Sequence, residues 1–216
     1  MSPRRAKAVP GRFGDDPATA LREHLIETAE KLLAERQVST ITTRDIARAA
    51  GLSDGVLYNY FSDKNELLLA ALTQRYAAAL EQFGSDLPRP GTATVEGNLV
   101  VYAQAALELV GGTLPIMAGL LSEPHLLHRF VDRIHTQPYG PSRMARPIAD
   151  YLAGEQKLGR LGDFDPEPAL SLIVGPVIML GFGGLMTGQS PQQLSDQLPG
   201  IVRTLLRGLA APGDPG

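Results

Sequence analysis

Apolar residues recur along this chain every three or four positions. Leu21, Leu25, Thr28 and Leu32 show this spacing, with charged residues between them, which is typical of an amphipathic helix. Runs in which β-branched and polar residues alternate are nearly missing. The pattern predicts an all-α protein, with helices expected near 17–36, 42–51, 53–61, 63–83, 94–110, 114–123, 125–135, 142–158, 166–187 and 191–210.

Polar residues mark the start of the first four helices. The expected N-cap residues are Asp16, Thr42, Ser53 and Ser62. Pro17 supports the first assignment, because proline suits the first helical position. Asp45 supports the second, because an acidic residue three positions after a threonine resembles a capping box. The joint from Asp86 to Thr92 is rich in proline and glycine, so it is expected to interrupt the helices.

The joints divide the chain into a small N-terminal helical unit and a larger helical bundle. Residues 1–17 are expected to form a disordered basic arm, because the first twelve carry four basic side chains and no acid. Residues 18–63 form the predicted N-terminal domain. Residues 64–212 form the bundle, and 213–216 a short tail.

Composition favours a globular cytoplasmic protein. The chain has 216 residues, of which 44% are hydrophobic and 20% charged, enough for a substantial core. Cysteine is absent, which excludes disulfides and thiolate metal sites and favours the cytoplasm. The net charge is −3, divided as +1 over residues 1–64 and −4 over the rest. The charge distribution therefore permits nucleic-acid binding at the N-terminal end.

Residues 42–61 have the pattern of a helix-turn-helix motif. Such a motif needs a small residue where its two helices touch and a residue that tolerates left-handed geometry in the turn. Ala47 and Gly51 fill these positions. The apolar residues expected to hold the helix crossing are Ile46, Ala50, Leu52, Leu57 and Tyr60.

Residues 19–79 resemble the tetracycline-repressor (TetR) family of bacterial transcriptional regulators. The resemblance is carried by the sequences IARAAGLS and LYNYF, and by Lys64 near the start of the next helix. It implies a three-helix DNA-binding domain at 18–63, whose second motif helix, from Ser53 to about Phe61, enters the major groove. The implied DNA-binding residues are Thr42, Thr43, Arg44, Ser53, Asp54, Gly55, Tyr58, Asn59, Tyr60 and Lys64.

The resemblance also implies a role for individual side chains. Tyr58 and Tyr60 reach the DNA, often through phosphates, and Lys64 neutralises a phosphate. Gly55 lets the backbone approach closely. Asn59 contacts a phosphate or pairs with adenine.

Asp54 departs from the family pattern, which commonly has Lys or Arg at this position. Thr43 and Arg44 are implied to place the first motif helix against the DNA backbone, where a nearby carboxylate is repulsive. Asp54 stabilises the N-terminus of its own helix, and it is able to accept a hydrogen bond from a cytosine amino group. The departure bears on operator affinity rather than on the fold.

The bundle is implied to bind an effector and to dimerise. The expected ligand is a mostly apolar small molecule, and the candidate pocket residues are Leu99, Tyr102, Met117, Leu121, Phe130, Met144 and Tyr151. In the family, the last two helices pack against those of a second copy. The candidate interface residues are Leu170, Ile173, Val174, Val177, Gly181, Gly184, Leu198, Val202 and Leu205.

The sequence therefore predicts a homodimeric, ligand-responsive transcriptional regulator, in particular a repressor that binds a near-palindromic double-stranded DNA operator. No cofactor is expected. Whether the effector releases DNA or promotes its binding is left open. No Ser/His/Asp arrangement or phosphate-binding loop supports an enzyme.

Two other interpretations remain. The segment from Ala169 to Gly188 has twenty residues without a charge, long enough to span a bilayer. It contains Gly175 and Pro176 and has no aromatic belt, which favours a helix buried in a soluble oligomer instead. In the second, His128, Asp132 and His135, with Glu123 and His125 nearby, hold a divalent metal or sense a signal.

Overall fold

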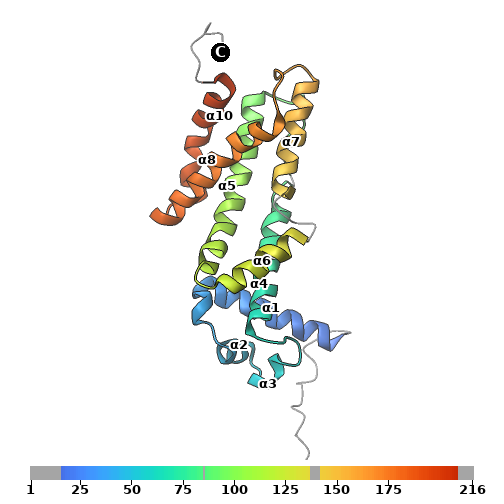
Figure 1. Cartoon of the computed structure of the whole chain (residues 1–216), viewed down its shortest axis with the longest axis vertical. Helices are drawn as coiled ribbons and strands as arrows, with labels where there is room; N and C mark the ends of the chain where they lie inside the picture. The colour runs from blue at the N-terminus through green and yellow to red at the C-terminus, as the bar shows by residue number, and fades with distance from the viewer. Residues whose placement is uncertain (1–15, 85, 137–141, 209–216) are drawn as a thin grey trace, which may run out of the picture. The chain divides into compact units, whose positions relative to one another are not determined.

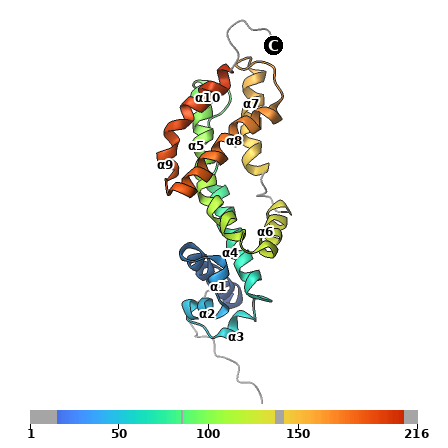
Figure 2. The same cartoon turned by 60° about the vertical axis from the view of Figure 1, so that its left-hand side comes forward.

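The computed structural model describes residues 16–84, 86–136 and 142–208, and within these ranges every regular element is helical. The predicted all-α fold is confirmed. The elements are α1 (Pro17–Glu35), η1 (Val38–Thr40), α2 (Thr43–Ala50), α3 (Asp54–Leu57), α4 (Lys64–Gln82), α5 (Val95–Leu120), α6 (Pro124–Thr136), α7 (Ser142–Lys157), α8 (Pro166–Thr187), α9 (Pro191–Leu194), η2 (Ser195–Gln197) and α10 (Leu198–Arg207) (Figures 1 and 2). The predicted basic arm and the tail lie outside the described residues, apart from the last two residues of the arm.

The chain forms two compact units. The N-terminal unit contains residues up to Arg75 together with Ala118–Arg133, and the C-terminal unit contains Tyr76–Met117 and the residues from Ile134 onward. The sequence placed this division at residue 63 instead. The difference arises because the first half of α4 supplies buried side chains to the N-terminal unit, among them Leu67, Leu68, Ala71 and Leu72.

Local hydrogen bonds explain where the first helices begin. The Asp16 carboxylate accepts from the amide of Ala18, and Thr42 forms the expected capping box with Asp45. The predicted cap at Ser62 is wrong. The carboxylate of Asp63 accepts from the Glu66 amide over 2.7 Å, while the Glu66 carboxylate accepts from the Ser62 amide over 2.6 Å.

The second motif helix is shorter than predicted. It was expected from Ser53 to about Phe61, but α3 ends at Leu57. The Ser53 side chain makes no capping hydrogen bond. Beyond Leu57 the amides of Asn59 and Tyr60 donate to carbonyl oxygens three residues earlier, at 3.1 and 3.0 Å. The segment therefore continues as tight turns rather than as an α-helix.

The predicted break between 110 and 114 does not occur, and α5 runs continuously through Pro115. A proline inside a helix removes one backbone hydrogen bond and usually kinks or ends it. Near this proline α5 packs closely against the start of α9, since a Cβ at Gly111 would lie 2.6 Å from Cγ of Pro191 in the same unit. At the other end of the chain, the single helix predicted at 191–210 is divided into α9, η2 and α10.

The core of the C-terminal unit is built mainly from α5, α7, α8 and α10, which lie alongside one another in both views (Figures 1 and 2). Tyr102 of α5 and Tyr151 of α7 are buried in it, with ring centroids 4.8 Å apart. Tilted aromatic pairs at this distance add to the stabilisation from burial.

Candidate nucleic-acid interface

The predicted helix-turn-helix is present in the N-terminal unit. Gly51 has a φ of +71°, the left-handed geometry that the turn requires. The amide of Leu52 donates to the carbonyl oxygen of Ala47 over 2.9 Å, closing the end of α2. Ala47 and Leu57 are buried, so the small contact residue and one of the apolar locking residues lie where the sequence placed them.

The second half of the motif presents its polar side to solvent. Ser53, Asp54, Gly55 and Asn59 are exposed, and Tyr58 is 57% exposed although it is a large apolar residue. A tyrosine that exposes most of its surface is available for a partner. Tyr60 is half-buried, so only part of it is accessible.

The first half of the motif contributes a second group of predicted residues. Arg44 is exposed and Thr43 is half-buried. Thr42 is exposed, but its hydroxyl donates to the Asp45 carboxylate over 2.6 Å and accepts from the Asp45 amide. The structure therefore gives Thr42 a capping role in addition to the predicted one.

Asp54 does not face the surface as an isolated negative charge. Its carboxylate lies 3.4 Å from Nε of Arg44, so the first turns of α2 and α3 are joined by an ion pair. Both side chains are more than half exposed, and an exposed pair contributes little to stability. The pairing offsets the repulsion that a lone carboxylate would exert on phosphates.

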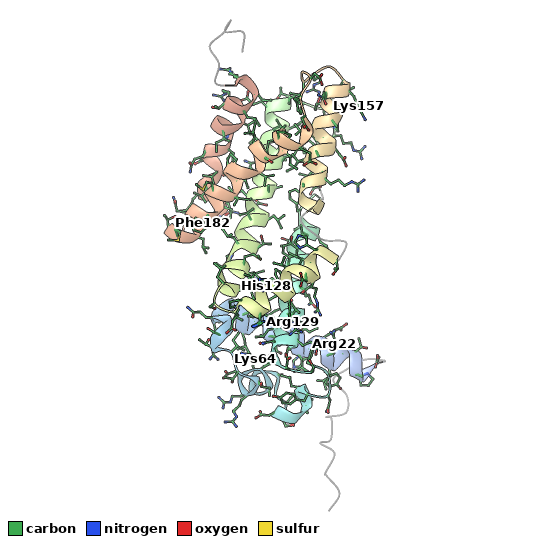
Figure 3. The ribbon with its side chains drawn as sticks, viewed as in Figure 1. Arg22, Lys64, His128, Arg129, Lys157 and Phe182 are labelled. Carbon is green, nitrogen blue, oxygen red and sulfur yellow. The ribbon has the colours of Figure 1, made fainter. Side chains whose placement is uncertain are left out.

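Lys64 has a structural partner that its position in the sequence did not indicate. Its ammonium group donates to the carbonyl oxygen of Ile41 over 2.9 Å. Ile41 directly precedes the N-cap of α2, and its side chain is fully buried. Lys64, labelled in Figure 3, is half-buried and lies on the same N-terminal unit as the motif.

Arg36 is a further residue that the sequence interpretation missed. Its guanidinium lies 3.5 Å from Asp45 and donates to the carbonyl oxygen of Thr40. Hydrogen bonds from the Thr42 hydroxyl and amide, and the charge of Arg36, hold the pKa of the Asp45 carboxyl below its usual value. A basic residue shortly before the capping box was the available signal.

The C-terminal unit contains an open cavity of about 510 Å³. Two predicted pocket residues, Tyr102 and Tyr151, line it together with Phe83, Pro88, Arg89 and Asp150. The Tyr102 hydroxyl donates to the Pro88 carbonyl oxygen over 3.0 Å. Burial, followed by the nearby Asp150 carboxylate, raises the pKa of Tyr102. The cavity combines apolar side chains with several polar groups, and small-molecule sites use both to bind and orient a ligand.

The remaining predicted pocket residues are not gathered at this cavity. Leu99 is buried in the core, and Met117 is half-buried in α5. Phe130 is buried in the N-terminal unit. Leu121 is 70% exposed in the turn that follows α5, so it is corrected to a surface residue. Met144 lies in α7, and its side chain is outside what the structure describes.

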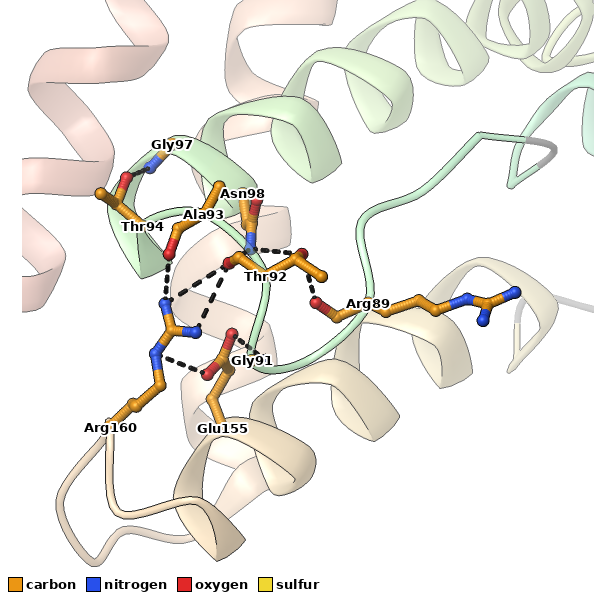
Figure 4. Close-up of polar contacts among 9 residues, drawn as sticks. All are labelled: Arg89, Gly91, Thr92, Ala93, Thr94, Gly97, Asn98, Glu155 and Arg160. Atoms are coloured by element: carbon orange, nitrogen blue, oxygen red, sulfur yellow. Dashed lines mark hydrogen bonds and ion pairs between the residues drawn. The ribbon is translucent and has the colours of Figure 1, made fainter.

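Next to this cavity, a polar cluster fastens the joint before α5 to the end of α7 (Figure 4). Glu155 is completely buried, accepts from the Gly91 amide over 3.2 Å and lies 3.2 Å from Nε of Arg160. Arg160 donates to the carbonyl oxygens of Thr92 and Ala93. Ala93 has a φ of +40°, a strained value for a residue with a side chain. The cluster holds that strained joint in place.

The interface residues predicted on α8 and α10 lie mainly within the core of their own unit. Six of them, Ile173, Val177, Gly181, Gly184, Leu198 and Val202, are buried within their own unit. Leu170, Val174 and Leu205 are half-buried and pack against the same core. Gly181 and Gly184 allow close approach inside one chain, because added Cβ atoms would lie 2.4 Å from Val110 and 2.7 Å from Leu194.

The opposite side of α8 is apolar and exposed. We call this side the outer face, and its residues are Leu172, Ile178, Met179, Phe182, Leu185 and Met186. Phe182 is labelled in Figure 3. Monomeric soluble proteins rarely expose so many large apolar side chains together, and such patches usually mark contact sites.

Two alternative interpretations can be compared with the structure. Two helices in the described ranges, α5 and residues 167–187 of α8, are long and apolar enough to cross a membrane by length and composition alone, a test that core helices of soluble proteins also pass. Among the described residues, no group of three or more His, Cys, Asp or Glu side chains is placed to hold a metal ion. The histidines of α6 therefore form no such cluster there.

Comparison with known proteins shows similarity to one family over part of the chain and to solved structures over most of it. Residues 25–71 match the sequence model of the bacterial regulatory proteins of the tetR family. The HTH-type transcriptional repressor AcnR of Corynebacterium efficiens is 26% identical over 200 residues, covering 90% of this chain and 96% of AcnR.

Solved structures share the overall fold. The fatty acid degradation regulator FadR from Bacillus halodurans has a TM-score of 0.62 at 17% identity, covering 90% of this chain and 97% of its own. The regulator FadR from Bacillus subtilis, in complex with stearoyl-CoA, has a TM-score of 0.59 at 16% identity, covering 87% and 99%. The match at 25–71 confirms the resemblance that the sequence showed over 19–79.

Proposed function

We propose that this chain, a regulator of the tetR family by the DNA-binding domain at residues 25–71, binds a near-palindromic operator as a homodimer and represses transcription in response to a small molecule. The observation that carries the proposal is the exposed side of the helix-turn-helix, where Tyr58, Asn59 and Arg44 face solvent on a buried framework. DNA-reading motifs have this arrangement, with apolar residues fixing the crossing and polar ones facing the groove.

In this proposal, α3 enters the major groove, and the first turn of α2 lies at the border between the groove and the DNA backbone. Tyr58 and Asn59 lie in the tight turns after α3, so they contact phosphates and sugars at the edge of the groove. Phosphate contacts fix the register of the protein on the duplex, and base contacts select the sequence. Lys64 adds a positive charge beside the motif while it supports the start of α2.

The homodimer is formed through the outer face of α8. Six large apolar side chains on one helix are poorly suited to water, and a second copy offers an identical apolar surface related by a twofold axis. A twofold dimer also explains why an operator would be nearly palindromic. The two half-sites would lie one helical turn, about 34–36 Å, or a multiple of it apart.

The effector binds in the cavity lined by Tyr102 and Tyr151. Phe83 and Leu87 supply apolar wall, and Arg89 and Asp150 supply polar groups. A mostly apolar molecule with one or two polar groups fits this lining. The ligand regulates DNA binding only to the extent that it binds one conformation of the dimer better than another. We place this activity in the cytoplasm, where the operator is.

The decisive test is fluorescence anisotropy of the purified protein with duplex DNA from just upstream of its own gene. Physiological salt and excess nonspecific competitor are needed, because affinities for DNA depend strongly on salt. Saturable binding that survives the competitor, and that Tyr58→Ala weakens about tenfold, is expected; a loss of about 1.4 kcal/mol corresponds to that factor. If this duplex does not bind and selection from random duplexes enriches no palindrome, the proposed function is wrong.

A further inference from the structure

Arg44 and Asp54 form the only ion pair between the two helices of the motif that the described residues show. Their side chains are 75% and 54% exposed, and the distance from Nε to Oδ2 is 3.4 Å. A guanidinium has five N–H donors and a carboxylate has two oxygens. The ion pair uses one N–H group of Arg44 and one oxygen of Asp54. The other N–H groups of Arg44 and the second oxygen of Asp54 can therefore bind another partner.

Space beside the pair is open. Gly55 follows Asp54 directly, and an added Cβ at this position would meet no atom within 4 Å. A flat partner can therefore approach the backbone next to Asp54 without displacing a side chain of this unit. The edge of a base pair in the major groove is such a partner.

The donors and acceptor of the pair match one kind of base pair. In the major groove, guanine presents two acceptors, N7 and O6, and its cytosine partner presents the N4 amino donor. The N–H donors of an arginine match the two guanine acceptors, and an adjacent carboxylate matches the cytosine donor. An A·T pair presents an acceptor, a donor and an acceptor, so it places a donor against the guanidinium.

We propose that Arg44 and Asp54 together read one G·C base pair in each operator half-site. Arg44 donates to N7 and O6 of guanine. Asp54 orients the guanidinium and accepts from the cytosine amino group. This inference rests on the proposed function as a DNA-binding regulator, and it gives a role to the acidic residue that replaces the basic residue common in the family.

The pair has no net charge, so it contributes sequence preference rather than general affinity. A lone arginine would instead bind phosphate and release counterions, which makes binding more dependent on salt. The salt dependence of binding therefore separates the two roles of Arg44. Lysine at position 44 keeps the charge but lacks the planar fork that binds guanine bidentately.

The test is selection of operators from a random duplex library by the full-length wild type, Asp54→Asn and Arg44→Lys. Glu23→Gln is the matched control, because it removes an exposed carboxylate from α1 of the same unit. Wild type and control are expected to enrich the same palindrome, with one symmetric position preferring G·C by about tenfold or more, as a bidentate contact provides. Both pair variants should enrich the same palindrome with the preference at that position reduced to about threefold or less.

Each other outcome has a separate meaning. If either variant keeps the wild-type preference at every position, the pair does not read a base pair and the inference is overturned. The same holds if the position that changes prefers A·T. If Arg44→Lys preserves the selected sequence and the salt dependence of binding, Arg44 is a phosphate contact. If wild type enriches no palindrome, the proposed function itself fails.

Discussion

The ammonium group of Lys64 donates to the carbonyl oxygen of Ile41 over 2.9 Å, joining the first turn of α4 to the residue before the N-cap of α2. The bond connects segments 23 residues apart in the chain. It ties the start of the DNA-binding motif to the helix that follows the motif. A residue assigned to DNA by resemblance therefore also contributes to the shape of the domain.

Replacement of this donor should affect both properties. Lys64→Met keeps most of the aliphatic stem and removes the ammonium, so the free energy of unfolding should fall by about 1 kcal/mol. Operator affinity measured well below the melting temperature should fall as well. Urea denaturation and anisotropy measure the two effects separately. Lys31→Met removes an exposed lysine of α1 as a control, and a Lys64 variant as stable as this control would mean that the bond contributes nothing.

Glu30 should make the protein less stable at neutral pH. Burial, and then the nearby Glu27 carboxylate, raises the pKa of Glu30 above its usual value of 4.5, with Arg75 opposing the shift. A carboxyl whose pKa is raised by folding destabilises the native state once pH exceeds the folded pKa, and this cost is absent below the unfolded pKa.

Glu30→Gln is therefore expected to raise the melting temperature at pH 7, with the gain disappearing as pH falls to about 4.5, the usual pKa of the group. Thermal denaturation of wild type and variant across this range measures the difference. Glu23→Gln, on the exposed side of the same helix, should show no such trend. A gain that stayed constant with pH would assign it to packing rather than to the charge.

The two sides of α8 should respond differently to substitution. Phe182 is 52% exposed on the outer face, so Phe182→Glu should convert the proposed dimer to a monomer without disturbing the core. Gly181 faces Val110, so Gly181→Leu should lower the free energy of unfolding by about 2 kcal/mol through overpacking. Sedimentation velocity and urea denaturation report the two effects. A Phe182→Glu protein that remained dimeric would place the interface elsewhere.

The cluster around Glu155 should stabilise the C-terminal unit. Glu155→Gln leaves Arg160 without its charged partner and weakens the acceptor for the Gly91 amide. The expected cost is about 2 kcal/mol, below that of a fully buried pair because Arg160 is partly exposed. Asp196→Asn removes an exposed acid from η2 of the same unit and serves as the control. Equal denaturation midpoints for the two variants would contradict the assigned role.

Local chemistry explains which features could be predicted from the sequence. The capping box at Thr42 and the left-handed turn at Gly51 depend on neighbours within a few residues, and both are present. The ion pair between Arg44 and Asp54 depends on how two helices cross. A list of residues gives no distance between them, so the sequence showed Asp54 only as an acid in an unexpected place.

Tertiary packing explains the features that were missed. Residues 111–115 (GGTLP) have the composition of a break, yet α5 continues through them, and Gly111 packs against Pro191, eighty residues away in the chain. The pocket prediction had a similar limit. Apolar residues between 99 and 151 were all suitable by type, but only the fold decides that Tyr102 and Tyr151 share a cavity and that Leu121 is exposed.

The interface prediction had a limit of a different kind, and its consequence extends beyond this contact. Because α8 is apolar on every side, polarity cannot distinguish its buried face from its exposed one. Side-chain volume does so instead, with glycine at 181 and 184 on the inside and Phe182 and Met186 on the outside. The substitutions that α8 tolerates should therefore be limited by side-chain volume rather than by hydrophobicity. Exchanges among large apolar residues should be tolerated outside, whereas even a methyl group should be rejected at the inner glycines.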